Sequence, residues 1–247
     1  MNLNNIYIYF QTMEYDTVIC IPYRDREKHL EGYLTNVVPL LRTYFPGVHV
    51  AIIEQAGTKI FNRGVLKNIG CHLFKDKTTY IMMNDVDTHP LEQTVRDIYT
   101  KPVNPSDVLG IYTSPCGTLG GVFKLRTETM LKTNGFPNDY WGYGAEDKVL
   151  QNRVEFVGFR KLTTILTDDP RVPEFFNVDN DHERAEAPNT LKQRTYTDYY
   201  LWPRMTQSTK EEYVRKSGFN TLTYTLLERI QLNDITEKIL VDIDSVQ

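Results

Sequence analysis

The feature of this sequence that most restricts its fold is an alternation of apolar runs and helical patterns that ends at the aspartates Asp85 and Asp87. Residues 18–22, 48–54 and 80–83 are largely apolar and read as buried strands. The segments between them carry apolar residues at the i, i+3, i+4 and i+7 spacing of amphipathic helices. This β-α-β-α-β order with short links predicts an α/β fold with a parallel sheet. Because open α/β sheets hold their ligands at the carboxyl ends of their strands, we expect the two aspartates at a ligand-binding edge.

A second segment combines an aromatic loop with two carboxylates. In the run from Trp141 to Asp147, glycines flank Tyr143, and Glu146 precedes the final aspartate at the start of a helical pattern. A mobile lid beside a catalytic acid would need this arrangement. Each motif alone has a plain structural explanation, because paired aspartates often cap a helix or form a turn, and an aromatic loop can simply fill a gap. Together they predict a transferase that uses a sugar nucleotide.

Composition restricts the class of protein. The chain has 247 residues, an average apolar fraction and no apolar tract long enough to cross a membrane, which predicts one domain over residues 1–247. The first 16 residues lack the features of a signal peptide, so we expect a non-anchored, soluble protein, for instance a cytoplasmic one. A net charge of −4 without a dense Lys/Arg block argues against nucleic acid as a partner.

The cysteines and the later half of the sequence give weaker signals. Cys20, Cys71 and Cys116 are odd in number and lack metal-ligand spacing, so we predict buried thiols and a reducing compartment. Prolines break the second half into loops around short strands, with one helix predicted near 146–157. The stretch 167–203 is polar and too long for an ordinary connection, which predicts a functional loop that ligand orders at least in part.

The succession of motifs resembles the catalytic domain of the β-1,4-galactosyltransferase family, glycosyltransferase family 7. The resemblance runs from about Thr17 to Ile243, after an N-terminal extension over residues 1–16. It implies a GT-A architecture: a Rossmann-like, mostly parallel sheet flanked by helices, with a looped half on the acceptor side. It also implies metal-dependent, inverting transfer of galactose from UDP-galactose, or a related UDP-sugar, to a hydroxyl of a glycan acceptor. The segments that carry the resemblance are Ile21–Arg26, Gln55–Gly57, Phe61–Arg63, Asp85–Asp87, Gly120–Val122, Asn134–Asn138, Trp141–Asp147 and Gly218–Tyr224.

The resemblance implies a metal site made by Asp87 and His182. In the family a third ligand, Met or His, precedes that histidine by two or three residues. This chain has Asp179 and Asn180 there, so the third ligand stays open. With Asp179 the set would be rich in oxygen and suited to manganese, with magnesium as an alternative.

A donor site is implied at the same edge. Arg24 and Arg26 follow the first strand and could meet phosphate or nucleoside. Arg63 stands at a helix start, where N–H groups and the helix dipole already favour anions. Thr118 takes the place of a family tyrosine that crowds the 2-substituent of the sugar, so we expect UDP-GalNAc to be tolerated alongside UDP-galactose. The full set of donor-binding residues is Pro22, Arg24, Arg26, Phe61, Arg63, Asp85, Val86, Thr118, Gly121, Tyr143 and Arg184.

On the acceptor side, Asp147 is the candidate general base, because inverting transfer needs a carboxylate near the attacking hydroxyl. Glu146 is expected to contact the donor sugar or to hold the loop. Ala145 and Lys148 are expected near the acceptor. Many family members have an acidic residue at the position of Lys148, so N-acetylglucosamine is not carried over as the acceptor.

Two other classes of protein remain as alternatives. Sugar nucleotidyltransferases usually cradle a triphosphate with a glycine-rich loop after the first strand, and the corresponding loop, 22–26, has no glycine. A non-catalytic sugar-binding module on a decayed transferase fold would be expected to lose Asp87, His182 or Asp147 first, and all three are present.

Overall fold

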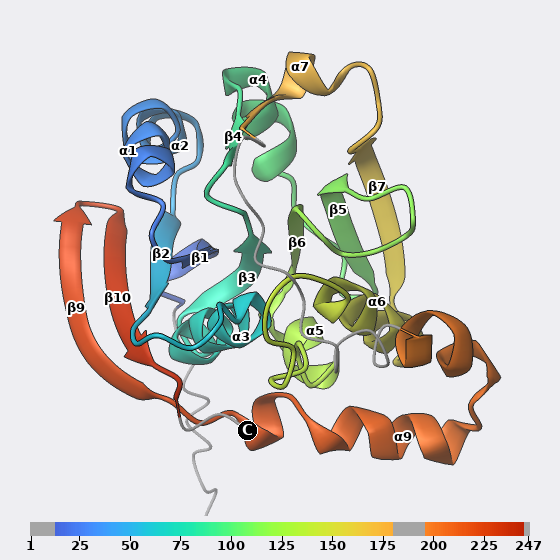
Figure 1. Cartoon of the computed structure of the whole chain (residues 1–247). Helices are drawn as coiled ribbons and strands as arrows, with labels where there is room; N and C mark the ends of the chain where they lie inside the picture. The colour runs from blue at the N-terminus through green and yellow to red at the C-terminus, as the bar shows by residue number, and fades with distance from the viewer. Residues whose placement is uncertain (1–12, 180–195, 245–247) are drawn as a thin grey trace, which may run out of the picture.

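The protein is built on an eight-stranded sheet in the order β7-β5-β6-β3-β1-β2-β10-β9, with a separate two-stranded sheet of β4 and β8 (Figure 1). The computed structural model describes residues 13–179 and 196–244. The strands are β1 Tyr15–Tyr23, β2 Val48–Gln55, β3 Thr78–Met83, β4 Thr88–Pro90, β5 Asp107–Thr113, β6 Val122–Arg126, β7 Arg160–Leu166, β8 Phe176–Val178, β9 Thr225–Asn233 and β10 Thr236–Asp242. The α-helices are α1 Glu27–Asn36, α2 Val38–Tyr44, α3 Arg63–Phe74, α4 Glu92–Thr94, α5 Thr127–Lys132, α6 Glu146–Phe156, α7 Val172–Phe175 and α9 Gln207–Lys216. Shorter turns are the π-helical η1 Val95–Tyr99 and η2 Thr197–Leu201 and the 3₁₀ turns η3 Trp202–Arg204 and η4 Phe219–Thr221.

The centre of the sheet is parallel. β1 pairs in parallel with both β2 and β3, and β10 adds to the far side of β2 in the same direction. The predicted β-α-β-α-β order over the first 85 residues is therefore confirmed. β6 lies antiparallel between β3 and β5, and β9 lies antiparallel to β10 at one edge. The sheet is thus mostly parallel with antiparallel insertions.

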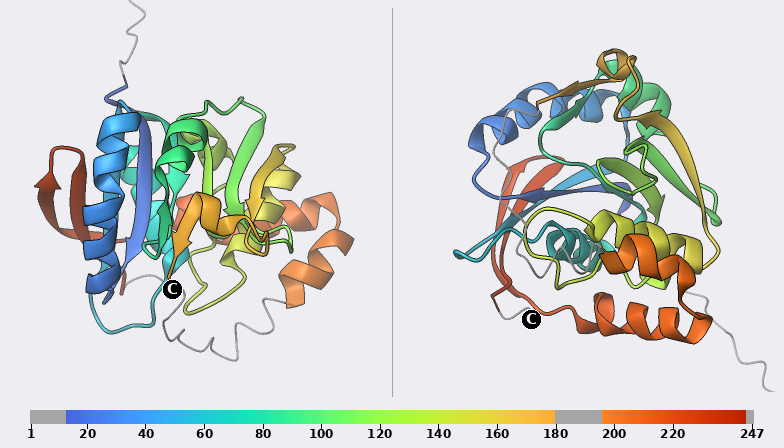
Figure 2. Two further views of the ribbon diagram at one scale, coloured as in Figure 1. Left: turned by 90° about the horizontal axis from the view of Figure 1, so that it is seen from above. Right: turned by 45° about the vertical axis from the view of Figure 1, so that its right-hand side comes forward.

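Helices cover both faces of this sheet, as Figure 2 shows. Along β1, Val18 and Cys20 point to the face covered by α3, α5 and α6, while Ile19 and Ile21 point to the face covered by α1, α2 and η1. This alternation follows from the period of two along a strand. Because both faces are buried, β1 reads as a continuous apolar run rather than an alternating one.

The structure corrects two predictions. The apolar pattern over 30–41 forms two helices rather than one, since α1 ends at Asn36 and α2 starts at Val38 with Pro39 in its first turn, where a missing N–H costs least. Cys20 and Cys71 are buried thiols as predicted, but Cys116 is exposed, because it lies on the loop between β5 and β6 rather than inside an element. Across the described part of the chain, no helix has both the length and the apolarity that crossing a bilayer requires.

Candidate active site

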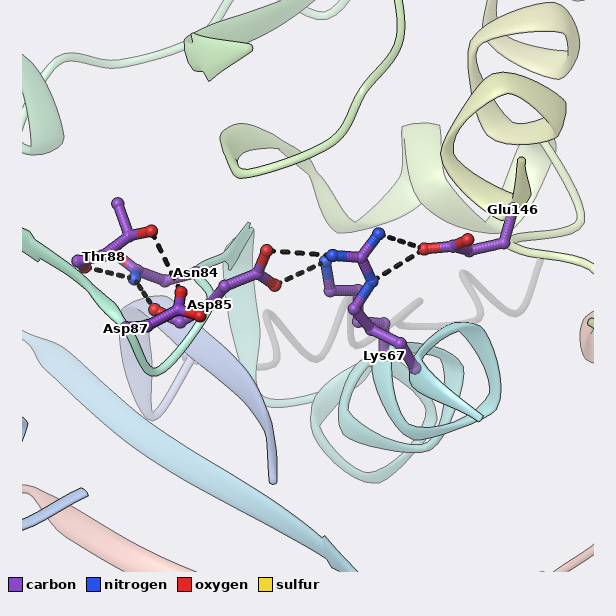
Figure 3. A network of polar contacts seen from close by, with 7 residues as sticks. Lys67, Asn84, Asp85, Asp87, Thr88 and Glu146 are labelled. Atoms are coloured by element: carbon purple, nitrogen blue, oxygen red, sulfur yellow. Dashed lines mark hydrogen bonds and ion pairs between the residues drawn. The ribbon is translucent and has the colours of Figure 1, made fainter. Parts of the chain in front are cut away.

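The aspartates follow β3 on a turn that Asn84 fixes. The Asn84 side-chain amide donates to the carbonyl oxygens of Asp85, at 2.8 Å, and Thr88, at 2.9 Å. Its oxygen accepts from the Tyr99 hydroxyl at 2.6 Å. The turn is closed by the Thr88 N–H, which donates to the Asp85 carbonyl at 3.1 Å. Figure 3 shows the two hydrogen bonds that the Asn84 amide donates. Asp85 and Asp87 therefore stand at the carboxyl end of a central strand, as the sequence predicted. Sequence reasoning missed Asn84, whose role depends on partners in η1 and β4.

The turn brings Asp179 beside Asp87. β4 and β8 pair antiparallel, and the Asp179 N–H donates to the Asp87 carbonyl at 3.0 Å. The Asp179 carboxylate lies 3.4 Å from Nε2 of His29, on α1. Two carboxylates on adjacent backbones are a donor set that fits a hard divalent cation.

The predicted metal site is described only in part. His182, Asn180 and the predicted donor residue Arg184 lie outside the described residues. Within 13–179 and 196–244, no three His, Cys, Asp or Glu side chains gather closely enough to hold a metal ion. Asp87 and Asp179 therefore remain the two predicted ligands whose positions are known.

Two cations on α3 surround the Asp85 carboxylate. Arg63 Nη1 lies 3.1 Å from Oδ2, and Lys67 Nζ lies 3.1 Å from Oδ1. Burial acts to raise the pKa of Asp85, but the charges of Lys67 and Arg63 outweigh it and hold the pKa below its usual value. The carboxylate is therefore ionised and fixed in orientation. The sequence predicted Arg63 at this site and missed Lys67, because the helical pattern does not distinguish Lys67 from the other polar residues of α3.

Arg63 also reaches the start of α6. Its Nε donates to Oε1 of Glu146 at 2.7 Å, and its Nη2 contacts the same oxygen. Burial acts to lower the pKa of Arg63, but the charges of Glu146 and Asp85 prevail and raise it well above its usual value. One guanidinium therefore joins the aspartate after β3 to the carboxylate pair predicted for catalysis.

Asp147 is half-buried in the first turn of α6. Its Oδ1 accepts from the Lys148 N–H at 2.7 Å. Its Oδ2 lies 2.6 Å from the point where a Cβ on Gly120 would stand, so a side chain at 120 would displace the carboxylate. Thr118 is buried beside the same point, with Oγ1 at 3.6 Å. Burial and the charge of Glu146 raise the pKa of Asp147, and Arg63 opposes them. A raised pKa brings a carboxylate closer to the range in which a general base works well.

The loop before α6 has the backbone that its glycines predict. Gly142 and Gly144 have φ values of +87° and +120°, and Ala145 adopts a left-handed conformation with φ +68° at the helix start. Between the glycines, the Tyr143 side chain is 51% exposed, so it is available to contact a ligand. The Gly142 N–H donates to the Phe61 carbonyl at 2.9 Å, which places the loop beside a second predicted donor residue.

Three buried asparagines hold this loop against α3. Asn62 caps the helix by accepting from the Val65 N–H at 3.0 Å, and it donates to the Asn138 carbonyl at 2.7 Å. Asn68 donates to Oδ1 of Asn138 at 2.9 Å and to the Phe136 carbonyl at 2.8 Å. The resemblance included these segments, but only the structure gives their role, which is to set the position of α6 relative to α3.

The remaining predicted donor residues line the turn after β1. Arg24 Nη1 donates to the Lys59 carbonyl at 2.5 Å, and its guanidinium lies 5.6 Å from the centre of the Phe61 ring. Arg26 Nη1 is buried and has no hydrogen-bond partner among the described residues. A buried guanidinium nitrogen without an acceptor costs free energy, which a bound anion would offset. Pro22 is buried near the end of β1, one residue before Tyr23 ends the strand.

Two other predicted donor residues have structural constraints of their own. Val86 is buried between the two aspartates. Gly121 has a φ of +75°, and a Cβ there would lie 2.4 Å from the Tyr112 carbonyl oxygen, so only glycine fits.

On the acceptor side, the structure adds a residue that the sequence did not single out. Lys148 Nζ lies 5.4 Å from the centre of the Tyr199 ring, and Tyr199 also packs against the cluster that contains Ala145. Burial, then the charge of Asp147, raises the pKa of Tyr199 to about 12. Tyr199 belongs to η2, so the end of the long polar stretch returns to the candidate site.

Two family models match the sequence in succession. The N-terminal region of glycosyl transferase group 7 matches residues 11–100, and the N-terminal domain of galactosyltransferase matches residues 104–179. Together they cover more than half of the chain. The first match contains Asp85 and Asp87, and the second contains Glu146 and Asp147.

Curated relatives give the same result. β-1,4-Galactosyltransferase 2 of Homo sapiens is 30% identical over 234 residues, which make up 91% of this chain and 58% of the relative. β-1,4-Galactosyltransferase 1 of Bos taurus is 29% identical over 236 residues, which make up 91% of this chain and 54% of the relative. The chain thus spans little more than half the length of these relatives.

Solved structures share the fold. The catalytic domain of Drosophila β1,4-galactosyltransferase 7, in complex with xylobiose, matches with a TM-score of 0.70 and 21% identity over 93% of this chain and 94% of that chain. A mutant of the same enzyme, in complex with manganese, UDP-Gal and xylobiose, matches with a TM-score of 0.67 and 21% identity over the same shares, 93% and 94%. The fold is that of the GT-A glycosyltransferases, as predicted. On the two family models and the relatives that agree with them, the chain belongs to the β-1,4-galactosyltransferase family, glycosyltransferase family 7.

Proposed function

We propose that this chain is a metal-dependent, inverting glycosyltransferase that moves galactose from UDP-galactose to a hydroxyl of a glycan. The observation that carries the proposal is Arg63, which holds Asp85 on one side and Glu146 on the other. A carboxylate that binds the ribose and a carboxylate pair that acts at the transferred sugar must face one and the same UDP-sugar, and one guanidinium fixes their separation. Membership in the family, and a structural neighbour that was solved in complex with manganese and UDP-Gal, support the same activity.

The donor diphosphate is proposed to bind at the carboxyl ends of β1 and β3. Asp87 and Asp179, with His182, would hold a divalent cation, manganese or magnesium, which supplies positive charge to the leaving UDP. Arg26 would donate to phosphate or nucleoside from the turn after β1, because its buried Nη1 lacks an acceptor among the described residues. Asp85 would accept hydrogen bonds from the ribose with the lone pairs that its two cations leave open.

Asp147 is proposed to act as the general base. The acceptor oxygen attacks the anomeric carbon from the face opposite UDP, the bond from that carbon to the UDP oxygen breaks, and the acceptor proton passes to Asp147. Attack from the opposite face inverts the configuration. Glu146, whose Oε1 is held by Arg63, would contact the donor sugar.

The identity of the sugar and acceptor belongs to the same proposal. Thr118, small and next to Asp147, would leave room for the N-acetyl group of UDP-GalNAc. Lys148 and Tyr199 would face the acceptor, Tyr199 with a ring suited to stacking on a sugar. Xylobiose, which the structural neighbour binds, is the first acceptor to try.

The direct test is UDP release. The protein is incubated with manganese and a panel of UDP-sugars, with and without candidate acceptors such as xylobiose. We expect release that depends on UDP-galactose and rises with the acceptor. Absence of release with every donor, while UDP still binds, would instead favour a non-catalytic sugar-binding module.

Binding gives a second test that does not need the acceptor. Because the cation would be shared by Asp87 and the diphosphate, UDP and manganese should each bind poorly alone. Asp87→Ala should abolish manganese-dependent UDP binding, measured by calorimetric titration. Asp97→Ala is the matched control, because Asp97 is exposed and its carboxylate pairs with its neighbour Arg96. Unchanged affinity in Asp87→Ala would remove this residue from the site.

A further inference from the structure

We propose that Lys67 is a positioning residue for the transfer proposed above: it takes up the charge of Asp85 and so leaves the Arg63 guanidinium to hold Glu146 beside the catalytic Asp147. The inference rests on the proposed function and extends it to a residue outside the donor and acceptor sets. Lys67 touches neither reacting group, and it acts through two other side chains.

Two cations contact the Asp85 carboxylate, one at each oxygen. Arg63 and Lys67 are one helical turn apart on α3, so both reach the same carboxylate. Lys67 takes Oδ1 and Arg63 takes Oδ2, each at 3.1 Å. The Lys67 side chain is only 1% exposed, and its remaining neighbour of note is the Phe136 ring, at 5.7 Å. Among the described residues, Asp85 is the carboxylate that compensates this buried ammonium.

Arg63 is shared unequally between its two carboxylates. One nitrogen, Nη1, faces Asp85, whereas Nε and Nη2 both face Oε1 of Glu146. A single guanidinium between two carboxylates moves toward the one that keeps more negative charge. Because Lys67 already offsets Asp85, Arg63 can give two of its three contacts to Glu146. Without Lys67, the partly buried Asp85 would have Arg63 alone, and the guanidinium would be drawn away from α6.

The charges around Asp147 make it sensitive to this shift. Glu146 precedes it on α6, and Arg63 faces it from α3. On the other sides stand Lys148, Tyr199 of η2 and Lys161 of β7, which all respond to its charge or lie beside it. These last groups do not depend on Lys67. Withdrawal of Arg63 would therefore leave Glu146 as an uncompensated negative charge beside the base.

The test is the pH profile of transfer in Lys67→Met, which removes the charge and keeps the shape of the side chain. We expect the acid limb of kcat/KM to move to higher pH by about one unit, as for a carboxylate that loses part of a cationic neighbour. Lys67→Arg should restore the profile. Lys132→Met on α5 is the control for an exposed lysine, and its profile should equal that of the wild type. A role in stability alone would lower activity at every pH without moving the limb.

A second measurement does not depend on activity. The free energy of unfolding is measured between about pH 4 and 8 for pairs that differ only by Asp147→Asn. Because the pKa of Asp147 is raised on folding, the protein with aspartate at 147 should lose stability relative to the protein with asparagine as pH rises above the unfolded pKa of 3.8. The difference in the free energy of unfolding should level off once the pH exceeds the folded pKa of Asp147. In the Lys67→Met background the levelling should come at higher pH.

The outcomes separate the two proposals. A wild type that binds UDP and transfers nothing would overturn the proposed function, and the unfolding measurement would still test Lys67. If the levelling pH and the acid limb are the same with lysine, arginine or methionine at 67, the positioning role is wrong. A shift in Lys67→Met that Lys67→Arg does not reverse would also overturn it, because the proposal depends on charge.

Discussion

At the scale of single residues, the candidate site depends on charges that are paired across the chain. Arg63 and Lys67 come from α3 and Asp85 from the turn after β3, while Glu146 and Asp147 come from α6. Each carboxylate has a different environment: Asp85 is held ionised by two cations, and Asp147 is pushed toward protonation by burial and Glu146. Environments that separate the pKa values of nearby acids are typical of sites with distinct roles for each acid.

Asp147→Asn should separate binding from chemistry. The substitution keeps the shape and removes the base, so UDP affinity should persist while kcat falls by about 10²–10⁴. Steady-state kinetics and calorimetric titration of UDP with manganese would measure the two effects. Glu155→Gln, at an exposed position of the same helix, should leave both unchanged. Near-normal turnover in Asp147→Asn would transfer the role of base to another group, with Glu146 the first to examine.

Thr118→Tyr should change the choice of donor. Thr118 is buried beside Gly120 and Asp147. In the proposed donor pocket, a tyrosine ring at this position would crowd a 2-substituent of the sugar. The ratio of kcat/KM for UDP-GalNAc to that for UDP-galactose should fall by at least about 10-fold, as for other pocket contacts. Thr118→Ser should keep the ratio of the wild type. No change in Thr118→Tyr would mean that residue 118 does not line the donor pocket.

The sequence predicted the ionisable residues of the site better than the residues that hold them. Asp85, Arg63 and Asp147 stand in motifs whose local order already indicates a strand end, a helix start and a loop before a helix. Asn84 and Lys67 have no such local signal. Tyr99 donates to the Asn84 oxygen, and Asp85 pairs with Lys67, and both of these contacts join segments that are separate in the sequence.

At the scale of elements, a buried aspartate connects three segments behind the site. The two Asp198 carboxylate oxygens accept from the hydroxyls of Tyr140 and of Tyr213, the latter at 2.6 Å, and its backbone carbonyl accepts from Asn152 of α6 at 3.0 Å. η2, α6 and α9 are therefore joined around this one residue, through its carboxylate and its backbone carbonyl. Burial raises the pKa of Asp198 to about 6, although both tyrosine hydroxyls act to lower it.

This junction predicts a pH dependence of stability. A carboxyl group whose pKa is raised on folding stabilises the fold fully below its unfolded value of 3.8 and loses that contribution as pH rises through about 6. The wild type should therefore lose on the order of 1–3 kcal/mol relative to Asp198→Asn across this range. Urea unfolding at a series of pH values measures the difference.

A control comes from the tyrosines. Tyr213→Phe removes one hydrogen bond that lowers the pKa of Asp198, so it should move the window to higher pH. Parallel pH dependences in the wild type and in Asp198→Asn would show that Asp198 does not titrate in this range.

The sequence predicted elements unevenly. α3 and α6 were predicted because their apolar positions follow the helical period. η2 was missed inside the stretch 167–203, because its residues are held by Tyr140 and Asn152 rather than by their own pattern. The β9–β10 hairpin was missed for a related reason: β9 is exposed along nearly its whole length and carries little periodic signal.

At the scale of the whole molecule, the sheet joins the two ends of the described chain. β10 lies between β2 and β9, and its residues Ile239 and Val241 enter the same core as α3 (Figure 1). The parallel centre could be predicted, because three early apolar runs alternate with helices. The insertion of β10 could not be predicted, since the residues of a strand do not indicate which other strand it pairs with.

Neighbouring strands provide a matched pair of substitutions. Ile239→Asp places an unpaired charge in the core beside β2 and should destabilise the protein by more than about 4 kcal/mol. Leu227→Asp, at a side chain 51% exposed on β9, should change stability by no more than about 0.5 kcal/mol. Chemical unfolding measures both. Similar values for the two would place β10 outside the core.

The position of β10 has a consequence for synthesis. β2 pairs with β1 on one side, but its other edge stays unpaired until residues 236–241 are made and form β10. During synthesis, the apolar strand β2 therefore has an unpaired hydrogen-bonding edge until residues 236–241 have left the ribosome. Bare apolar edges recruit other strands. Slow translation between β2 and β10 should therefore increase aggregation or dependence on chaperones, even where every residue of the candidate site is intact.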